Sequence, residues 1–216
     1  MILCVTGPMA AGKNFVSDIL CSMGFVSVDA DSLAHDAVDI CTKKIVDEFS
    51  SLAREKGIEL LDSDGKIIRR NLGALIFTDP ELVRRQENIV FPQIAAMFDS
   101  FLDAHRGSDV VVNATVLYKM PILIKKMDAV IFVTAPSFVR FFRARKRDGL
   151  PAGQILDRFR MQKNLFAKYK KSHADTLKVR NTGSKKSLER RLEKILSELK
   201  NRMGNAKWNK KEHCGF

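Results

Sequence analysis

The fold of this 216-residue chain is decided by the stretch Val5-Thr6-Gly7-Pro8-Met9-Ala10-Ala11-Gly12-Lys13-Asn14. An apolar run, residues 2–5, precedes it, and an amphipathic segment follows it. A strand, then Gly, four residues, Gly-Lys and a helix is the layout of a phosphate-binding loop. Such glycines allow backbone angles that a Cβ would block, and the loop N–H groups point at an anion at the positive end of the helix. The sequence therefore predicts a nucleoside triphosphate site, although a glycine-containing turn with a chance lysine would have the same spacing.

Each position of the loop has an expected role. Lys13 supplies a mobile positive charge for the β- and γ-phosphates. Asn14 stands where Ser or Thr usually offers a hydroxyl to Mg²⁺, and its side-chain carbonyl oxygen is the donor that remains. The residues expected to bind ATP here are Gly7, Ala10, Ala11, Gly12, Lys13, Asn14 and Phe15.

The chain carries a formal net charge of +12 and four cysteines. A nucleic-acid partner and a pair of polyanionic substrates are both compatible with that charge. No aromatic residues interleave the basic runs as they do on single-strand binding surfaces, so we expect phosphate handling and no nucleic-acid partner. There is no membrane-length apolar run and no signal-peptide pattern, which predicts a cytoplasmic protein with reduced thiols. Cys4 and Cys21 have apolar neighbours and are expected in the core.

Apolar periodicity predicts an α/β fold with a five-stranded parallel sheet flanked by helices. The expected strands are 2–6, 25–28, 109–114, 128–134 and 176–179. The expected helices are 13–23, one from about 30, 42–56, 80–105, 136–147, 152–171 with a break, and 187–203. A single domain over residues 1–203 would hold a helical lid at about 147–171 and a helical region at about 64–105, and 204–216 would form a polar tail.

The second expected strand ends in Val28-Asp29-Ala30-Asp31. Carboxyl ends of parallel strands gather ligands in such sheets, so these carboxylates are candidates for a general base and a magnesium ligand. As residues alone, both aspartates serve equally well as helix N-caps.

The order of motifs resembles that of the dephospho-coenzyme A kinase family, over residues 1 to about 200. The matching segments are the phosphate loop, Asp29-Ala30-Asp31, Asp64-Gly65 to Arg69 and Leu72, Gln86 to Pro92, Arg143 with Arg147-Asp148-Gly149, Arg158 to Gln162, and Asn181-Thr182-Gly183. The resemblance implies a P-loop kinase fold with ATP and dephospho-coenzyme A as substrates, Mg²⁺ as cofactor, and coenzyme A and ADP as products. Spacing alone stops at a P-loop kinase. A different nucleoside or nucleotide kinase, or a catalytically weak relative with nucleic-acid affinity, remains the alternative.

The resemblance also implies roles for single residues. Lys13, Asp31 and Arg147 would be catalytic, Asp31 and Arg69 would contact the acceptor, Arg143 and Asn181 would bind ATP, and Asn14 and Asp29 would hold the metal. Each has a plainer alternative: a helix-start arginine for Arg69, a solvated basic helix for the arginine pair, and a turn for Asn181. On that helix, Arg145 and Lys146 are expected on other faces. No membrane association is expected, and we expect a monomer or a weak homo-oligomer.

Three positions depart from the family pattern. Asn14 replaces Ser or Thr, and Phe91 replaces a histidine before proline. Thr115 to Lys119 stands where the family has Pro-Leu-Leu-Phe-Glu, so a proline is missing and an acid has become a lysine.

Overall fold

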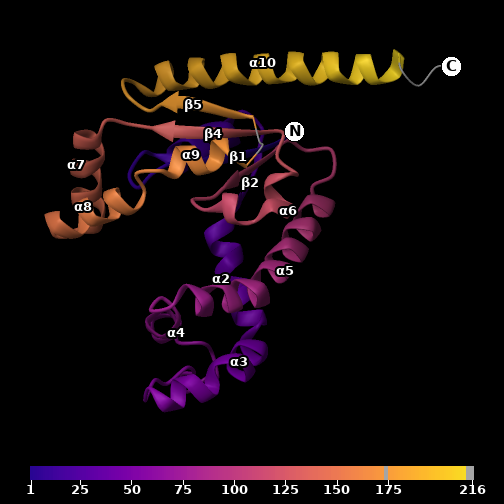
Figure 1. The fold of residues 1–216 in the computed structure, drawn as a ribbon. Coiled ribbons are helices and arrows are strands. Elements are labelled where there is room, and N and C mark those ends of the chain that lie inside the picture. The colour runs from indigo at the N-terminus through magenta and orange to yellow at the C-terminus, as the bar shows by residue number, and fades with distance from the viewer. Residues whose placement is uncertain (173–174, 213–216) are drawn as a thin grey trace. The chain divides into compact units, whose positions relative to one another are not determined.

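The structure is a computed structural model that describes residues 1–172 and 175–212, with side chains described as far as residue 203. Its strands are β1 (Ile2–Thr6), β2 (Val26–Asp29), β3 (Val110–Asn113), β4 (Ala129–Thr134) and β5 (Thr176–Arg180). Its helices are α1 (Lys13–Ser22), α2 (Ala30–Ile40), α3 (Thr42–Glu55), α4 (Arg69–Ile76), α5 (Pro80–Ala104), η1 (Leu117–Lys119), α6 (Pro121–Ile124), α7 (Ser137–Asp148), α8 (Ala152–Met161), α9 (Leu165–Lys170) and α10 (Lys185–Glu212) (Figure 1). Every expected strand lies within one residue of its predicted bounds at each end.

The five strands form one sheet in the order β2-β3-β1-β4-β5. β1 lies in the middle and pairs in parallel with β3 on one side and with β4 on the other. β4 in turn pairs in parallel with β5. The apolar residues of β1, β3 and β4 are buried because helices cover both faces of a parallel sheet. The α/β fold with a parallel sheet is confirmed, and β1 delivers the phosphate loop from the centre of the sheet.

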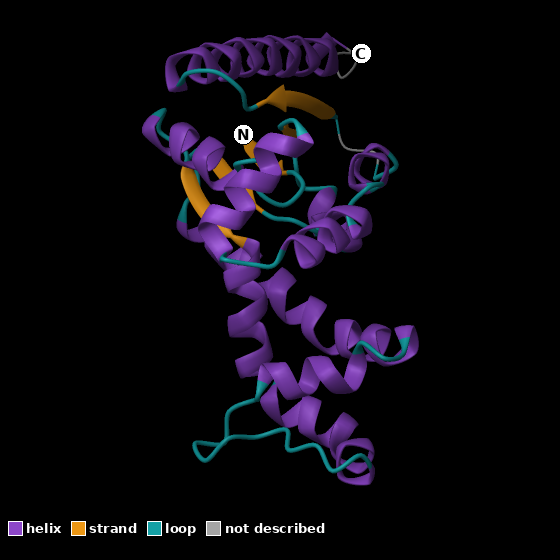
Figure 2. Cartoon of the chain, turned by 90° about the vertical axis from the view of Figure 1, so that its left-hand side faces the viewer, coloured by secondary structure: helices purple, strands orange, loops and turns teal. Residues whose placement is uncertain are grey.

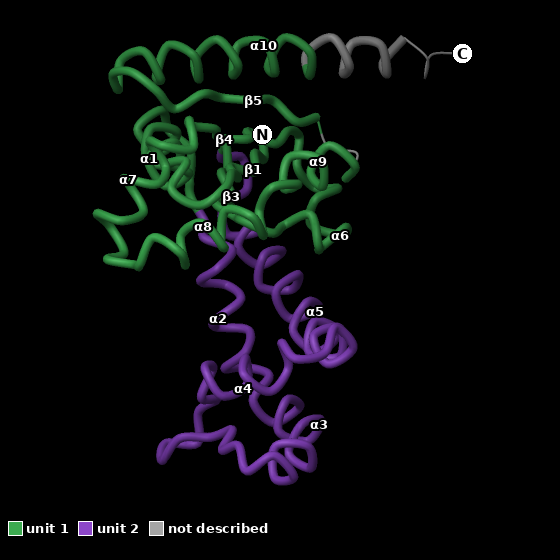
Figure 3. The backbone as a smooth tube through the Cα atoms, turned by 60° about the vertical axis from the view of Figure 1, so that its left-hand side comes forward, with its two compact units in different colours: residues 1–27, 109–216 green, residues 28–108 purple. Residues whose placement is uncertain are grey.

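Contacts divide the chain into two compact units (Figure 3). The first comprises Met1–Ser27 and Asp109–Phe216, and the second comprises Val28–Ser108. In the first unit, α10 runs alongside the edge strand β5 and contacts it (Figure 2). Its apolar stripe of Leu188, Leu192 and Leu196 joins the hydrophobic core of this unit. In the second unit, α2 and α3 pack on each other and both pack on α5, which α4 also contacts. The helical region predicted at about 64–105 lies in this second unit.

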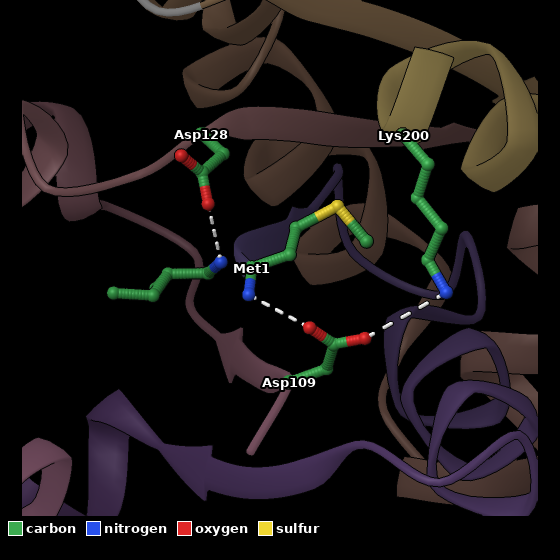
Figure 4. Close-up of polar contacts among 5 residues, drawn as sticks. Met1, Asp109, Asp128 and Lys200 are labelled. Atoms are coloured by element: carbon green, nitrogen blue, oxygen red, sulfur yellow. Dashed lines mark hydrogen bonds and ion pairs between the residues drawn. The ribbon is translucent and has the colours of Figure 1, made fainter. Parts of the chain in front are cut away.

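The start of the first unit is fixed by charged groups (Figure 4). The α-amino group of Met1 lies 2.7 Å from Asp109 Oδ1, and Lys200 of α10 approaches the other oxygen at 3.9 Å. Asp128, just before β4, accepts from the backbone N–H of Ile2 at 2.7 Å while its own N–H donates to the Ile2 carbonyl. These contacts set the register of β1 at the end opposite the phosphate loop.

The structure corrects three expectations. The last helix was predicted to end at Met203 but continues to Glu212, because the segment after it holds no proline and several good helix formers. The short helices η1 and α6 were not predicted, since each is too short to show a period, whereas α4 begins at Arg69, where a helix start was the plainer alternative. Cys21, expected in the core, is exposed, whereas Cys4 and Cys41 are buried. The break predicted within 152–171 is confirmed, because α8 and α9 are separate helices with a turn between them.

Candidate functional site

The phosphate loop needs its two glycines for steric reasons. A Cβ on Gly7 would collide with the carbonyl oxygen of Val133, and a Cβ on Gly12 would collide with the side-chain amide of Asn181. Gly12 also has a φ of 95°, in the left-handed region, at the N-terminus of α1. Ala10 is the only described non-glycine residue with a positive φ, 59°. Because that conformation costs an L-residue roughly 1–2 kcal/mol, the surroundings must hold this part of the loop in place.

Two side chains from distant segments contact the loop and its lysine. Asn181, after β5, is buried and donates from Nδ2 to the carbonyl oxygen of Ala11 at 2.9 Å. Its own N–H donates to Thr134 at the end of β4. Lys13 Nζ donates to Thr115 Oγ1 at 2.7 Å. The structure thus brings the predicted residues Lys13 and Asn181 to one edge of the sheet.

A cavity of about 750 Å³ opens beside the loop. Its lining comprises Pro8, Ala10, Ala11, Gly12, Lys13, Asn14, Phe15, Arg143, Lys146, Arg147, Asn181, Gly183 and Lys185. Every residue expected to bind ATP lines this cavity except Gly7. Gly7 instead allows the loop to pass close to the backbone of Val133. Five of the lining residues are cationic, so the cavity suits a polyanion such as a triphosphate.

The helix α7 presents more of its basic residues to this cavity than was predicted. Arg143 and Arg147 line it as expected, one helical turn apart. Lys146 was placed on another face, and that prediction is wrong, because Lys146 also lines the cavity. Arg147 pairs with Asp148 at 2.6 Å, and this hydrogen bond raises the pKa of Arg147, so its charge is secure.

Two further contacts to the loop were missed by sequence reasoning. Arg140 of α7 donates from Nε to the carbonyl oxygen of Met9 at 2.9 Å. Gln162, which caps the end of α8, accepts from the N–H of Met9 at 2.6 Å. In the sequence, Gln162 stands out only as part of the family pattern, and Arg140 only as part of a basic run. The signal available in the sequence was the spacing of Arg140, Arg143 and Arg147, which places all three on one side of a helix.

The metal-ligand candidates can be described only in part. Asn14 Oδ1 accepts from Asn113 Nδ2 at 3.0 Å, so its carbonyl oxygen is oriented by the end of β3. Within the described ranges, no three His, Cys, Asp or Glu side chains are grouped as a metal cage would require. An ion here would take most of its ligands from phosphate oxygens and water, which is the usual arrangement for Mg²⁺.

The remaining candidates belong to the second unit. Asp29 is the N-cap of α2, and its Oδ1 accepts from the N–H groups of Asp31 and Ser32 at 2.9 and 3.1 Å. Asp31 is exposed in the first turn of that helix. Arg69 begins α4 and pairs with Asp39 at 2.6 Å, with a weaker contact to the carbonyl of His35. The helix-cap interpretation therefore holds for Asp29, and Arg69 is already oriented by an acid of α2.

Beneath the loop lies a buried pair, Cys4 and Tyr169. Burial raises the pKa of the Cys4 thiol to about 12, against smaller opposing effects of Lys13 and of a hydrogen bond to Tyr169. Burial also raises the pKa of Tyr169, whose hydroxyl accepts from the N–H of Leu117 and donates to the carbonyl of Thr115. Both groups stay neutral, so they are part of the packing under Lys13 and no candidates for nucleophiles.

With this geometry in place, comparison with known proteins identifies the family. The family model for dephospho-CoA kinase matches residues 1–186. The chain belongs to the dephospho-CoA kinase family. It is 32% identical over 196 residues to the dephospho-CoA kinase of Treponema pallidum, covering 89% of this chain and 92% of that one. It is 34% identical over 206 residues to that of Treponema denticola, covering 94% and 90%.

Solved structures agree with the fold of a dephospho-CoA kinase. TT1252 from Thermus thermophilus matches with a TM-score of 0.75 at 28% identity, covering 92% of this chain and 97% of that one. The dephospho-CoA kinase from Campylobacter jejuni matches with a TM-score of 0.59 at 26% identity, covering 92% and 96%. The predicted family, P-loop kinase fold and kinase activity are confirmed, and a nucleic-acid-binding relative is not favoured. Among the described helices, none has both the length and the apolarity that a bilayer span requires.

Proposed function

We propose that the chain transfers the γ-phosphoryl group of ATP to the ribose 3′-hydroxyl of dephospho-coenzyme A. The bond between the γ-phosphorus and the bridging oxygen of ADP breaks, and a new phosphorus–oxygen bond forms with the hydroxyl, whose proton leaves. The single observation that carries this proposal is the cavity beside the phosphate loop, lined by Lys13 and four further cations of the same unit. The chain's full-length similarity to dephospho-CoA kinases supports the choice of acceptor.

The chain's own residues have positioning and electrostatic roles, as in phosphoryl transfer generally. Loop N–H groups and Lys13 bind the β- and γ-phosphates, while Arg143 and Arg147 cover the transferring group. Asn181 fixes the loop through its hydrogen bond to Ala11. Phe15 contributes an apolar side chain, and Gly183 contributes backbone, to the wall of the cavity against which the nucleoside would lie. We assign Asp31 to orienting and deprotonating the acceptor hydroxyl, and Arg69 to contact with the acceptor.

We also propose Mg²⁺ as the cofactor. Its function when bound is to neutralise phosphate charge. Asn14 would contribute its side-chain oxygen, and the shortage of clustered acids in the described part of the chain supports a site completed by phosphates and water. Asp29 as a ligand remains a prediction, because its carboxylate already caps α2. A cytoplasmic location also remains a prediction, supported by three free cysteines in the described residues.

A coupled assay of ADP release with an acceptor panel tests the proposal. The panel contains dephospho-coenzyme A, coenzyme A, adenosine and a nucleoside monophosphate. We expect ADP release above the ATPase background only with dephospho-coenzyme A, because coenzyme A already carries the product phosphate. Release with the nucleoside monophosphate and none with dephospho-coenzyme A would replace this proposal with the alternative nucleotide kinase.

A further inference from the structure

One residue of the phosphate loop, Met9, is held on both of its backbone polar groups by side chains of α7 and of the end of α8. Its N–H donates to Gln162 Oε1 at 2.6 Å, and its carbonyl oxygen accepts from Arg140 Nε at 2.9 Å. Neither side chain lines the cavity beside the loop. Their contacts are therefore with the shape of the loop and not with a ligand in that cavity.

Met9 occupies the second position of a tight turn. The N–H of Ala11 donates to the carbonyl of Pro8 at 3.0 Å, which closes a four-residue turn over Pro8-Met9-Ala10-Ala11. The third residue, Ala10, has a φ of 59°. A positive φ at the third position distinguishes a type II turn from a type I turn, and the two differ mainly by a flip of the central peptide. The central peptide here joins Met9 to Ala10.

Arg140 holds that central peptide. In a trans peptide the N–H points opposite to the C=O. Fixing the Met9 carbonyl on Arg140 therefore turns the N–H of Ala10 away from Arg140. Ala10 lines the cavity. With the Met9–Ala10 peptide in the type II orientation, the N–H of Ala10 is therefore one more donor for an anion in that cavity. Without the hydrogen bond from Arg140, an alanine at position 10 would favour the type I turn, since glycine is the residue that accepts a positive φ freely.

Arg140 is built into this place. Its guanidinium lies 4.0 Å from the ring centroid of Phe159 on α8, a cation–π contact. Its Nη2 is buried and has no hydrogen-bond partner among the residues that the structure describes. Burial lowers the pKa of Arg140. A surface arginine would avoid this burial, and the contact that accompanies it here is the hydrogen bond to Met9.

We infer that Arg140 is a positioning residue that sets the flip of the Met9–Ala10 peptide and thereby completes the anion-binding form of the phosphate loop. Arg143, Lys146 and Arg147 lie on the same helix and line the phosphate cavity. The helix that contacts the phosphates thus also sets the shape of the loop beneath them. This inference deepens the proposed function and rests on it, because it assumes that the loop binds a nucleoside triphosphate.

The test is the affinity for ATP in the absence of acceptor, measured by calorimetry on four proteins. Arg140→Met removes the donor at the Nε position and keeps an unbranched side chain beside Phe159. Arg145→Met removes one charge from an exposed position of the same helix that does not line the cavity. The third protein is Arg140→Met combined with Ala10→Gly, and the wild type is the fourth. Thermal melting of each protein checks that it is folded.

We expect Arg140→Met to weaken ATP binding roughly tenfold, the scale of one lost hydrogen bond to a charged group. Arg145→Met should bind as the wild type does. Ala10→Gly should recover most of the loss in the Arg140→Met background, because glycine adopts the positive φ without help. A purely structural role of Arg140 would not be rescued by removing one methyl group from the loop.

Two results would overturn the inference: unchanged affinity in Arg140→Met, or a loss that Ala10→Gly does not reduce. If Arg140→Met does not fold, Arg140→Gln is compared with its own Ala10→Gly double variant in the same way. Failure of the wild type to bind ATP would instead overturn the proposed function, so the two failures are distinguishable.

Discussion

Lys13 and Thr115 are joined by a hydrogen bond of 2.7 Å from the lysine Nζ to the threonine Oγ1. Thr115 is one of the departures from the family pattern, which has proline at this position and so no hydroxyl for the lysine. The Thr115 carbonyl oxygen also accepts from Tyr169 and from Thr6, so the backbone at this position is fixed. If Lys13 binds phosphate as we propose, its hydrogen bond to Thr115 must break when a triphosphate binds.

From this relationship we predict that Thr115→Val strengthens ATP binding by about two- to twelvefold. The net value of such a hydrogen bond is about 0.5–1.5 kcal/mol, and its loss removes a competitor for the Lys13 charge. Thr115→Ser keeps the hydroxyl and is the matched control, expected to bind like the wild type. Calorimetric titration with ATP measures both, and weaker binding by Thr115→Val would show that the hydroxyl assists the bound state instead.

For Asp31 we predict a defect in turnover and little change in stability. Positioned general bases contribute about 10²–10⁴-fold, so Asp31→Asn should lower kcat by that range while ATP still binds. Asp31 is exposed, and its side chain is not the cap of α2, so the fold should tolerate the change. Steady-state kinetics with dephospho-coenzyme A across a pH series checks this, and an unchanged profile would remove the assigned role.

For Asp29 we predict the reverse pattern. Asn and Asp are nearly equal as N-caps, whereas Ala costs about 1 kcal/mol. Asp29→Asn should keep the melting temperature, and Asp29→Ala should lower the free energy of unfolding by about that amount. If Asp29 also holds magnesium, Asp29→Asn will need more Mg²⁺ for half-maximal rate, and this titration decides between cap alone and cap plus ligand.

Asn14 gives a prediction on metal use. Its Oδ1 faces the Asn113 amide, so one of its lone pairs is already engaged. Asn14→Ser should lower the Mg²⁺ concentration needed for half-maximal rate, because a hydroxyl at the end of a shorter side chain is the usual ligand here, and Asn14→Leu should raise it sharply. Superimposed magnesium titrations of the three proteins would show that Asn14 lies outside the metal site.

Cys4 gives a prediction on pH. Its pKa is raised from 9.0 to about 12 in the folded protein. Between those values the unfolded chain loses a proton that the folded chain keeps, so stability falls as the pH rises through this window. From about pH 8 to about pH 10.5 the wild type should lose roughly 2 kcal/mol more than Cys4→Ala. Urea unfolding at both pH values measures the difference, and parallel losses would contradict it.

How far the sequence predicts this molecule depends on how local each signal is. The strand bounds and the loop from Gly7 to Phe15 follow from apolar runs and from fixed spacing, which are local properties. The hydrogen bond of Asn181 to Ala11 spans 170 positions, and the two contacts to Met9 span 131 and 153. The periodicity of apolar residues cannot predict hydrogen bonds between side chains and backbone groups so far apart in the sequence.

The errors have physical causes of the same kind. Lys146 was placed off the site because helical spacing sorts residues by angle and ignores the reach of a lysine, whose flexible stem spans much of a helix face. The sequence is compatible with Asp29 as a cap and as a ligand, and the hydrogen bonds at the start of α2 show the cap. Cys21 was expected in the core from its apolar neighbours, but its position on α1 points it to solvent.

The most direct test of the central claim is the structure of the product that the purified chain makes from ATP and dephospho-coenzyme A. Phosphorus NMR and mass spectrometry should show that the product is coenzyme A, with the new phosphate on the ribose 3′-oxygen. Lys13→Ala should reduce its formation by at least about 10²–10³-fold, the scale of a lost electrostatic group at the transferring phosphate. Lys186→Ala, an exposed lysine of α10 that does not line the cavity, should act as the wild type does. Product formation by a folded Lys13→Ala above a tenth of the wild-type rate, or phosphate on another atom, would contradict the account.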